Sequence, residues 1–349
     1  MIMSNDILLD NLEKLGELYR NNKEYLGQWE KNVLKDENNW WEALKFFLNH
    51  SLMKGRRDSL SLDYYYFTCK VIEDVYKINE NSKEAYKKIQ KDRDNKKFDY
   101  KEIVENFKRD EGKKLNSNIL LNKEDKTNEQ KKSKKNKEEL EAKKIINKKF
   151  KDSVNGNTLV KELINDKLVE NRRKNNHYSL ENDKDLCMIL KVLEFISDAN
   201  RKNVYTYLLD LIKEDNIKQA YDEVKKLKEI GDKLSCFILR DILLLNEDIS
   251  LKEEDYIYAF PIDTWVLKNA KKLGFLESEE ISKNLTEMSS KEKDSIKQKL
   301  IEKNKNHNHL KFAAGLWLIG IKSLELLVEN YLKKEKISNE FILSPTYDD

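Results

Sequence analysis

The sequence contains very few of the residues that interrupt helices: 9 glycines and 2 prolines among 349 residues. Average usage would give about 24 glycines and about 17 prolines. Because β-sandwiches, barrels and propellers rely on these residues in their many turns, such architectures are disfavoured. The Gly-rich loops that bind nucleotides are excluded as well, since neither GxGxxG nor GxxxxGK[ST] occurs. The scarcity of both residues therefore predicts an all-α fold.

The spacing of apolar residues supports the same fold class, because they recur at helical intervals along almost the whole chain. In the first part of the chain they predict helices over residues 7–19, 40–52 and 60–76. Later helices are expected over 158–170, 184–197, 201–213, 216–228, 233–245, 263–273, 278–284, 290–303 and 308–334. No alternating pattern typical of strands competes with these assignments.

Composition and the lack of targeting signals in the sequence argue against a membrane-spanning or secreted protein. Charged residues make up 38% of the chain, which is typical of a polar-surfaced helical protein. No stretch approaches the roughly 18 apolar residues of a membrane span, and the first ten residues do not resemble a secretory signal. Cys69, Cys187 and Cys236 are too far apart to form a disulfide framework or a metal-binding set. We therefore expect a cytoplasmic protein without a membrane partner.

Residues 109–152 differ from the rest of the chain, because large apolar residues become rare and lysines accumulate. This segment has 15 Lys or Arg against 9 Asp or Glu, whereas the whole chain has a net charge of only +3. We interpret it as a charged insertion or linker, and a basic arm that neutralises phosphates is the alternative. The predicted organisation is an N-terminal helical region (1–108), this insertion, a second helical region (153–335) and a tail (336–349).

A short turn between two predicted helices is the first candidate for chemistry. It reads Lys228-Glu229-Ile230-Gly231-Asp232, and Lys233 follows at the start of a mostly apolar helix. Gly231 can adopt a positive φ, and the unpaired backbone N–H groups of the next helix can hold a phosphate. Desolvation at the mouth of a buried helix would free the Lys233 amine to act as a nucleophile. An ordinary surface lysine is the alternative.

The second candidate is Phe260-Pro261-Ile262-Asp263-Thr264-Trp265, which follows after a long loop. Asp263 stands at the expected N-cap of a helix that ends near Gly274. Taken alone, Asp263 is a capping residue and Lys233 is one of many lysines. Their combination, each in its own sequence context, is far more specific than either residue.

Together these segments resemble the helix-hairpin-helix DNA glycosylases of the endonuclease III superfamily. Gly231-Asp232-Lys233 matches the end of the family's hairpin, and Pro261-Ile262-Asp263-Thr264 matches its Pro-Val-Asp-Thr-like segment. Residues 312–320 are similar to the C-terminal helix that packs beside the base pocket in this family. Asp263 follows Lys233 by 30 residues, a spacing closer to the archaeal 8-oxoguanine glycosylase branch than to bacterial endonuclease III.

The resemblance implies a two-lobed helical fold and a bifunctional DNA glycosylase and abasic-site lyase. Lys233 would attack C1′ of a damaged nucleotide, for example one carrying an oxidised purine such as 8-oxoguanine, and form a Schiff base. Asp263 would stabilise positive charge on the sugar and assist proton transfer. The target base must leave the stack, because C1′ is not accessible to the nucleophile inside the duplex.

The resemblance also implies which residues contact DNA. Those expected are the hairpin residues Ile230, Gly231 and Asp232, together with Trp265 beside a phosphate. Arg56 and Arg57 lie in a compact basic turn, where they would contact phosphate or bridge the lobes through carboxylates.

Aromatic residues offer candidates for the base pocket. Phe237 and Trp317 are expected there, whereas Trp40-Trp41 and the run 64–67 are expected mainly in the core.

One departure from the family leaves a second function open. The usual hairpin reads Leu-Pro-Gly-Val-Gly, and Glu229 replaces its first glycine, which puts a carboxylate near the expected phosphate. A catalytically silent DNA- or protein-binding module is therefore the alternative to the enzyme.

The expected partners and cofactors follow from the same comparison. The four cysteines of the iron–sulfur branch are missing after Asp263, so neither a cluster nor another cofactor is expected. A monovalent or divalent ion at the hairpin stays open. His307-Asn308-His309 is interpreted as a loop before a helix rather than as a metal site. We expect a nucleoid-associated monomer that binds double-stranded DNA with a damaged base.

Overall fold

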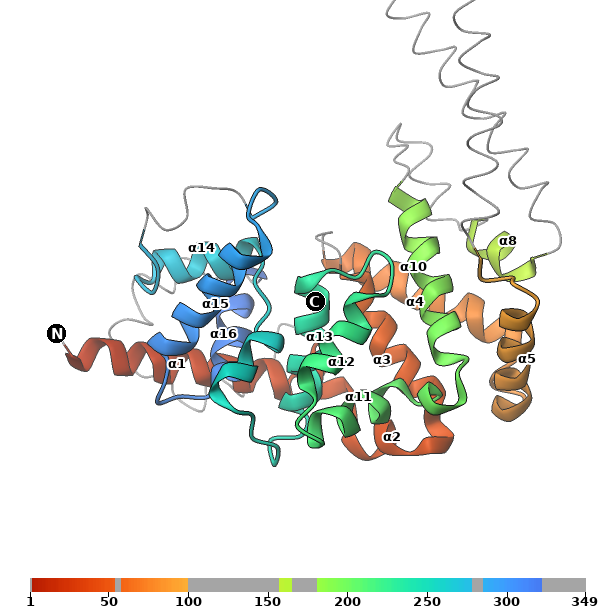
Figure 1. Ribbon diagram of the computed structural model, residues 1–349, viewed down its shortest axis with the longest axis horizontal. Coiled ribbons are helices and arrows are strands. Elements are labelled where there is room, and N and C mark those ends of the chain that lie inside the picture. The colour runs from red at the N-terminus through yellow and green to blue at the C-terminus, as the bar shows by residue number, and fades with distance from the viewer. Residues whose placement is uncertain (1, 54–57, 100–156, 165–180, 278–284, 322–349) are drawn as a thin grey trace, which may run out of the picture. The chain divides into compact units, whose positions relative to one another are not determined.

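The computed structural model describes residues 2–53, 58–99, 157–164, 181–277 and 285–321 (Figure 1). These residues form helices joined by turns and contain no strand, which confirms the all-α class. The chain divides into two compact units, one made of Met1–Ser61 and Asn200–Asp349 and the other of Leu62–Ala199. The predicted boundaries at 108 and 153, the Lys-rich insertion, the basic turn with Arg56 and Arg57, and the tail lie outside the described residues.

The first unit contains both segments singled out above. Its α-helices are α1 (Ile2–Asn21), α2 (Lys31–Lys35), α3 (Trp40–Leu52), α11 (Val204–Lys213), α12 (Ile217–Lys225), α13 (Asp232–Leu244), α14 (Thr264–Lys272), α15 (Ser290–Lys303) and α16 (His309–Ile321). Short 3₁₀ turns complete it: η1 (Leu26–Gln28), η2 (Glu37–Asn39) and η5 (Glu253–Tyr258).

The second unit contains α5 (Ser82–Asp94), α8 (Thr158–Ile164) and α10 (Glu181–Ile196). The helix α4 (Asp58–Tyr76) and the turn η4 (Ala199–Arg201) each cross a boundary between the units. Within the second unit the Tyr86 hydroxyl on α5 donates to the Ile196 carbonyl at the end of α10, over 3.0 Å. The Asn157 side chain accepts from the Val160 N–H and so caps α8.

Most of the predicted helices are present, with ends that shift by a few residues. Helices α2 and α5 were not predicted, because α2 is a single short turn and α5 has only three apolar positions in thirteen. The predicted segments 165–170 and 278–284, and the part of the last helix beyond residue 321, lie outside the described residues.

Close packing of α1 against α16 fixes the position of the last helix. A Cβ built on Gly16 of α1 would lie 2.1 Å from the Lys311 carbonyl oxygen, and one on Gly315 would lie 2.2 Å from the Leu12 carbonyl oxygen. Only glycine allows the two backbones to approach so closely. Two of the nine glycines therefore serve the contact between these helices.

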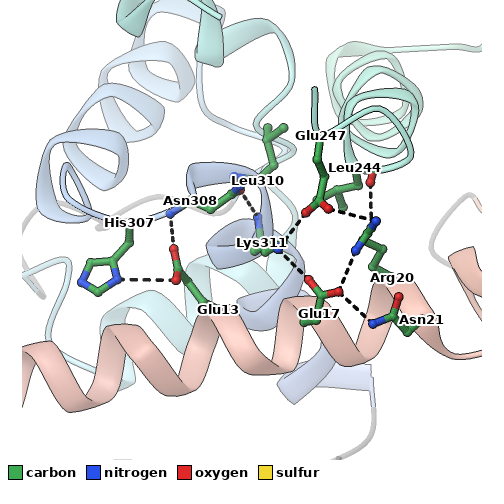
Figure 2. A network of polar contacts seen from close by, with 10 residues as sticks. All are labelled: Glu13, Glu17, Arg20, Asn21, Leu244, Glu247, His307, Asn308, Leu310 and Lys311. Atoms are coloured by element: carbon green, nitrogen blue, oxygen red, sulfur yellow. Dashed lines mark hydrogen bonds and ion pairs between the residues drawn. The ribbon is translucent and has the colours of Figure 1, made fainter. Parts of the chain in front are cut away.

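A polar network at the edge of this contact joins α1, α16 and the chain after α13 (Figure 2). The Lys311 ammonium lies 2.6 Å from Glu17 and 2.7 Å from Glu247. Arg20 pairs with the same two carboxylates and donates from Nε to the Leu244 carbonyl. The network ties α16 to the end of α13, and these two helices carry Trp317 and Phe237.

Candidate catalytic site at the helical hairpin

The helical hairpin consists of α12, the turn 226–231 and α13. The turn passes through a left-handed conformation at Glu229, where φ is 69°. Gly231 has φ −101° and ψ −174°, so the prediction that Gly231 supplies the positive φ is wrong. In the helix-hairpin-helix glycosylases that the sequence resembles, the position of Glu229 is the first glycine of the hairpin. Glycine is the residue most easily accommodated in a left-handed backbone conformation. The turn thus has a glycine-type conformation without the glycine.

The start of α13 leaves backbone donors without a side-chain cap. Gly231 is the N-cap residue, and glycine has no side chain that could accept from the N–H groups of the first turn. Gly231 is exposed, and a Cβ there would meet nothing within 4 Å. Ile230, in contrast, is buried and donates its N–H to the Leu227 carbonyl, so it anchors the turn. The open edge of the hairpin therefore lies at Gly231 and the first turn of α13.

Exposed lysines surround this edge. Lys225, Lys226 and Lys228 lie on the turn or directly before it, where Glu229 is half-buried and Glu223 pairs with Lys226 over 3.8 Å. The electrostatic balance of the hairpin therefore remains positive despite Glu229.

Lys233 and Asp263 come together at this hairpin. The Lys233 ammonium lies 3.5 Å from Asp263 Oδ2, with the side chains 30% and 9% exposed. Asp263 Oδ1 accepts the Val266 N–H over 2.9 Å, which confirms that Asp263 is the N-cap of α14. The helix then ends just before Gly274, whose φ of 85° matches the predicted helix end. One carboxylate thus fixes the start of α14 with one oxygen and faces the lysine with the other.

Asp232, the third predicted hairpin contact, turns its carboxylate inward. Its Oδ1 accepts from the Tyr221 hydroxyl over 2.7 Å and from the Lys297 ammonium over 2.6 Å. Burial favours the neutral carboxyl, but Lys297 and these hydrogen bonds outweigh it and hold the pKa of Asp232 below its usual value. The side chain is therefore an ionised internal partner rather than a surface contact.

The two residues predicted for the base pocket lie against each other. Phe237 of α13 and Trp317 of α16 are buried, with ring centroids 5.1 Å apart in an edge-to-face arrangement. Tyr19 and Tyr25 also meet the Trp317 ring edge-on, at 5.6 and 6.2 Å. These four rings, hereafter the aromatic cluster, come from α1, the chain after it, α13 and α16.

A buried arginine adjoins the aromatic cluster. The Arg240 guanidinium is fully buried, 4.1 Å from the Phe237 centroid and 4.8 Å from that of Tyr19. Its Nε donates to Asp241 Oδ1 over 2.8 Å, while Nη1 and Nη2 have no partner among the described residues. The rings of Phe237 and Tyr19 beside these atoms give the guanidinium cation–π contacts.

Asp241 holds this arginine in a small charged network. Asp241 Oδ2 accepts from Tyr19 and lies 2.8 Å from His50 Nε2, while His50 Nδ1 lies 2.7 Å from the Phe46 carbonyl. Both imidazole nitrogens of His50 therefore lie within hydrogen-bonding distance of an oxygen acceptor. Burial would raise the pKa of Asp241, yet Arg240 and His50 hold it below its usual value.

The sequence reasoning missed Arg240, Asp241, His50 and Lys297. A usable signal was present for two of them, because Arg240-Asp241 is a charged pair inside an otherwise apolar stretch of α13. Helical spacing puts that stretch in the core, and buried charges there are rarely accidental. His50 and Lys297 lie on distant helices and carry no such signal.

Several other predicted residues have clear positions. Trp265 is 39% exposed beside Asp263, with Lys268 5.4 Å over its ring and Gly320 directly against it. Among the aromatic residues expected in the core, Trp40, Trp41, Tyr64 and Tyr65 are buried, whereas Tyr66 is exposed.

The other two histidines in the described part of the chain have structural partners. His309 is buried against the Tyr256 ring, and His307 lies 3.7 Å from Glu13. In the described part of the chain no cluster of three or more His, Cys, Asp or Glu residues could hold a metal ion.

No family model, curated protein or solved structure matches the chain. None of the described helices is both long enough and apolar enough to cross a membrane. Inferences about activity therefore depend on the geometry of the hairpin, the Lys233–Asp263 pair and the aromatic cluster.

Proposed function

We propose that the chain is a bifunctional DNA glycosylase and abasic-site lyase that acts on double-stranded DNA with a damaged base. The observation that carries the proposal is the 3.5 Å approach of Lys233 to Asp263 at the open edge of a helical hairpin. The two residues are 30 positions apart, and each was singled out from its own sequence context. This reaction requires an amine nucleophile, a carboxylate beside it and a site for a DNA phosphate. Lys233, Asp263 and the backbone N–H groups at the start of α13 are suited to these three roles.

The proposed reaction begins with transfer of a proton from the Lys233 ammonium to Asp263. The free amine attacks C1′, so a C1′–N bond to the lysine forms while the glycosidic bond breaks, and the base leaves with that electron pair and takes up the proton held by Asp263. Asp263 is then a carboxylate again and can stabilise positive charge on the sugar. The C1′–O4′ bond breaks as a proton passes from the amine nitrogen to O4′, which opens the sugar ring and gives an iminium ion, the Schiff base. Loss of a proton from C2′ and cleavage of the C3′–O bond, with the 3′ phosphate as the leaving group, complete β-elimination.

Recognition of the base is assigned to the aromatic cluster and Arg240. Phe237 and Trp317 offer ring faces for stacking once their edge-to-face contact opens. The Nη1 and Nη2 donors of Arg240 suit acceptors on a purine edge, namely O6 and N7 of guanine, or O6 or O8 of 8-oxoguanine, in which N7 carries a hydrogen and donates. These donors fit guanine and its oxidised form alike, so the oxidised purine is proposed from the family resemblance.

A catalytically silent DNA- or protein-binding module is the second candidate. The left-handed Glu229 favours it, because a carboxylate near the expected phosphate weakens the standard contact. In that case the Lys233–Asp263 pair is a structural ion pair at a helix start. Lys233→Gln would then lower DNA binding no more than the loss of any hairpin lysine.

The test is base release from duplexes that each carry a single lesion, with an abasic duplex and an undamaged duplex alongside. We expect release of an oxidised purine, cleavage of the abasic strand, and loss of both activities in Lys233→Gln. Lys228→Gln is the matched control, because it removes an exposed lysine from the same hairpin. Binding without release or strand cleavage on every duplex would favour the silent module.

A further inference from the structure

A fully buried lysine lies behind the hairpin. Lys297 of α15 has a side chain only 1% exposed, and its ammonium lies 2.6 Å from Asp232 Oδ1 and 3.6 Å from Asp294 Oδ1. It also lies 3.3 Å from the Cys236 sulfur. A lysine is almost never buried to this degree unless a partner holds its charge, and here Asp232 is that partner.

The same carboxylate is engaged from several helices. Tyr221 of α12 donates to it, and the Lys225 ammonium in turn donates to the Tyr221 oxygen over 2.9 Å. The Cys236 sulfur lies 3.7 Å from it, and burial raises the pKa of that thiol to about 12, so Cys236 stays neutral. These contacts turn the Asp232 side chain away from the open edge of the hairpin.

The place of Asp232 in the sequence makes this orientation important. It is the first residue of α13, directly between the exposed Gly231 and Lys233. A free carboxylate there would repel a phosphate at the hairpin and would favour the protonated, unreactive form of the Lys233 amine. It would also interact well with the positive end of the helix dipole, so the helix start tolerates it.

We propose that Lys297 is a positioning residue that neutralises Asp232 and holds it inward, which preserves both phosphate affinity at the hairpin and the reactivity of Lys233. The inference rests on the proposed function. It concerns a residue on α15 that touches neither DNA nor the reacting sugar.

The charged and titratable groups that face Asp232 and Lys233 define what a pH experiment can report. They are Tyr221 and Lys225 from α12, Cys236 from α13, Asp263 at the start of α14, and Asp294 and Lys297 from α15. Of the cations in this set, Lys297 is the one in direct contact with Asp232 that is fully buried. Changes at Lys297 and at Asp232 should therefore shift the pH profile in opposite directions.

The experiment uses the full chain and measures two quantities: the dissociation constant for a duplex with a tetrahydrofuran abasic analogue, and the pH midpoint of borohydride trapping on abasic DNA. Lys297→Met should weaken binding several-fold and move the trapping midpoint up by roughly 0.5 pH unit. Asp232→Asn should tighten binding and move the midpoint down. Asp232→Asn/Lys297→Met should restore both values to near those of the parent, and Lys297→Arg should retain them.

If Lys297 is a positioning residue, the two single variants shift the trapping midpoint and the dissociation constant in opposite directions, and the double variant cancels both shifts. A merely structural role would instead lower activity in both single variants at every pH. Unchanged values in a folded Lys297→Met, or shifts of the same sign in both variants, would overturn the inference. If Lys297→Met does not fold, Asp232→Asn and the double variant still decide it. A parent that is never trapped contradicts the proposed function itself, whereas a trapped parent with unshifted variants contradicts only the role of Lys297.

Discussion

Substitutions of Asp263 can distinguish its structural role from its proposed catalytic role, because its two carboxylate oxygens make different contacts. Oδ1 caps α14 through Val266, and Oδ2 faces Lys233. Asp263→Asn keeps a capping oxygen but removes the charge, whereas Asp263→Ala removes both. Loss of an N-cap side chain costs about 1 kcal/mol, and loss of a part-exposed ion pair costs at most about 1 kcal/mol. We therefore expect Asp263→Ala to lose about 1–2 kcal/mol and Asp263→Asn less than about 1 kcal/mol.

Catalysis should not follow stability. Both variants lose the carboxylate that accepts the lysine proton, so base excision should fall by roughly 10²- to 10⁴-fold in each. The assays are urea unfolding and single-turnover base release on the same preparations. Asn81→Ala is the matched control, since it removes the N-cap of α5 in the other unit, where Asn81 accepts from Glu84. Full excision activity in Asp263→Asn, or an equal loss of unfolding free energy in Asp263→Asn and Asp263→Ala, would refute the assignment of capping to Oδ1 and catalysis to Oδ2.

Three further predictions follow from the same geometry. Arg240→Met should lower excision of an oxidised purine while abasic-strand cleavage persists, because an abasic site has no base for Arg240 to read; equal losses in the two assays would argue against base reading. Gly315→Ala should cost about 1–3 kcal/mol in urea unfolding, since its Cβ would lie 2.2 Å from the Leu12 carbonyl oxygen, and an unchanged midpoint would contradict the close packing of α1 and α16. Asp241→Asn should cost about 3–5 kcal/mol at neutral pH because it leaves the buried Arg240 guanidinium without its charged partner. Arg240 and His50 lower the pKa of Asp241 in the folded protein. The stability that the Asp241 carboxylate provides is therefore present above about pH 4 and lost as the pH falls below that value. The urea midpoint of the parent should consequently decline more steeply in acid than that of Asp241→Asn.

The fold class and the N-cap role of Asp263 were accessible from the sequence because both depend on local patterns, whereas the pairing of Lys233 with Asp263 was an expectation from the family resemblance. Helical spacing of apolar residues predicts helices, and an Asp before an amphipathic helix predicts the N-cap that Asp263 forms. Pro261 and Gly274 also stand where expected, two residues before the N-cap Asp263 and directly after the C-cap residue Leu273.

The remainder depends on contacts between distant segments. The left-handed residue of the hairpin was assigned to Gly231, but the backbone puts it at Glu229. Lys297 lies 65 positions from Asp232 and His50 lies 191 positions from Asp241, so no spacing rule relates them. Such partners become visible only when the packing of the helices is known.

The position of the covalent bond to DNA tests the central proposal most directly. The chain has 58 lysines, so borohydride trapping alone does not identify which amine reacts. The measurement is mass spectrometry of the peptides from a trapped complex with duplex DNA that carries an oxidised purine. We expect the adduct on Lys233 and no adduct in Lys233→Gln. An adduct distributed over the exposed lysines, or one that persists in Lys233→Gln, would contradict the proposal that Lys233 is the nucleophile.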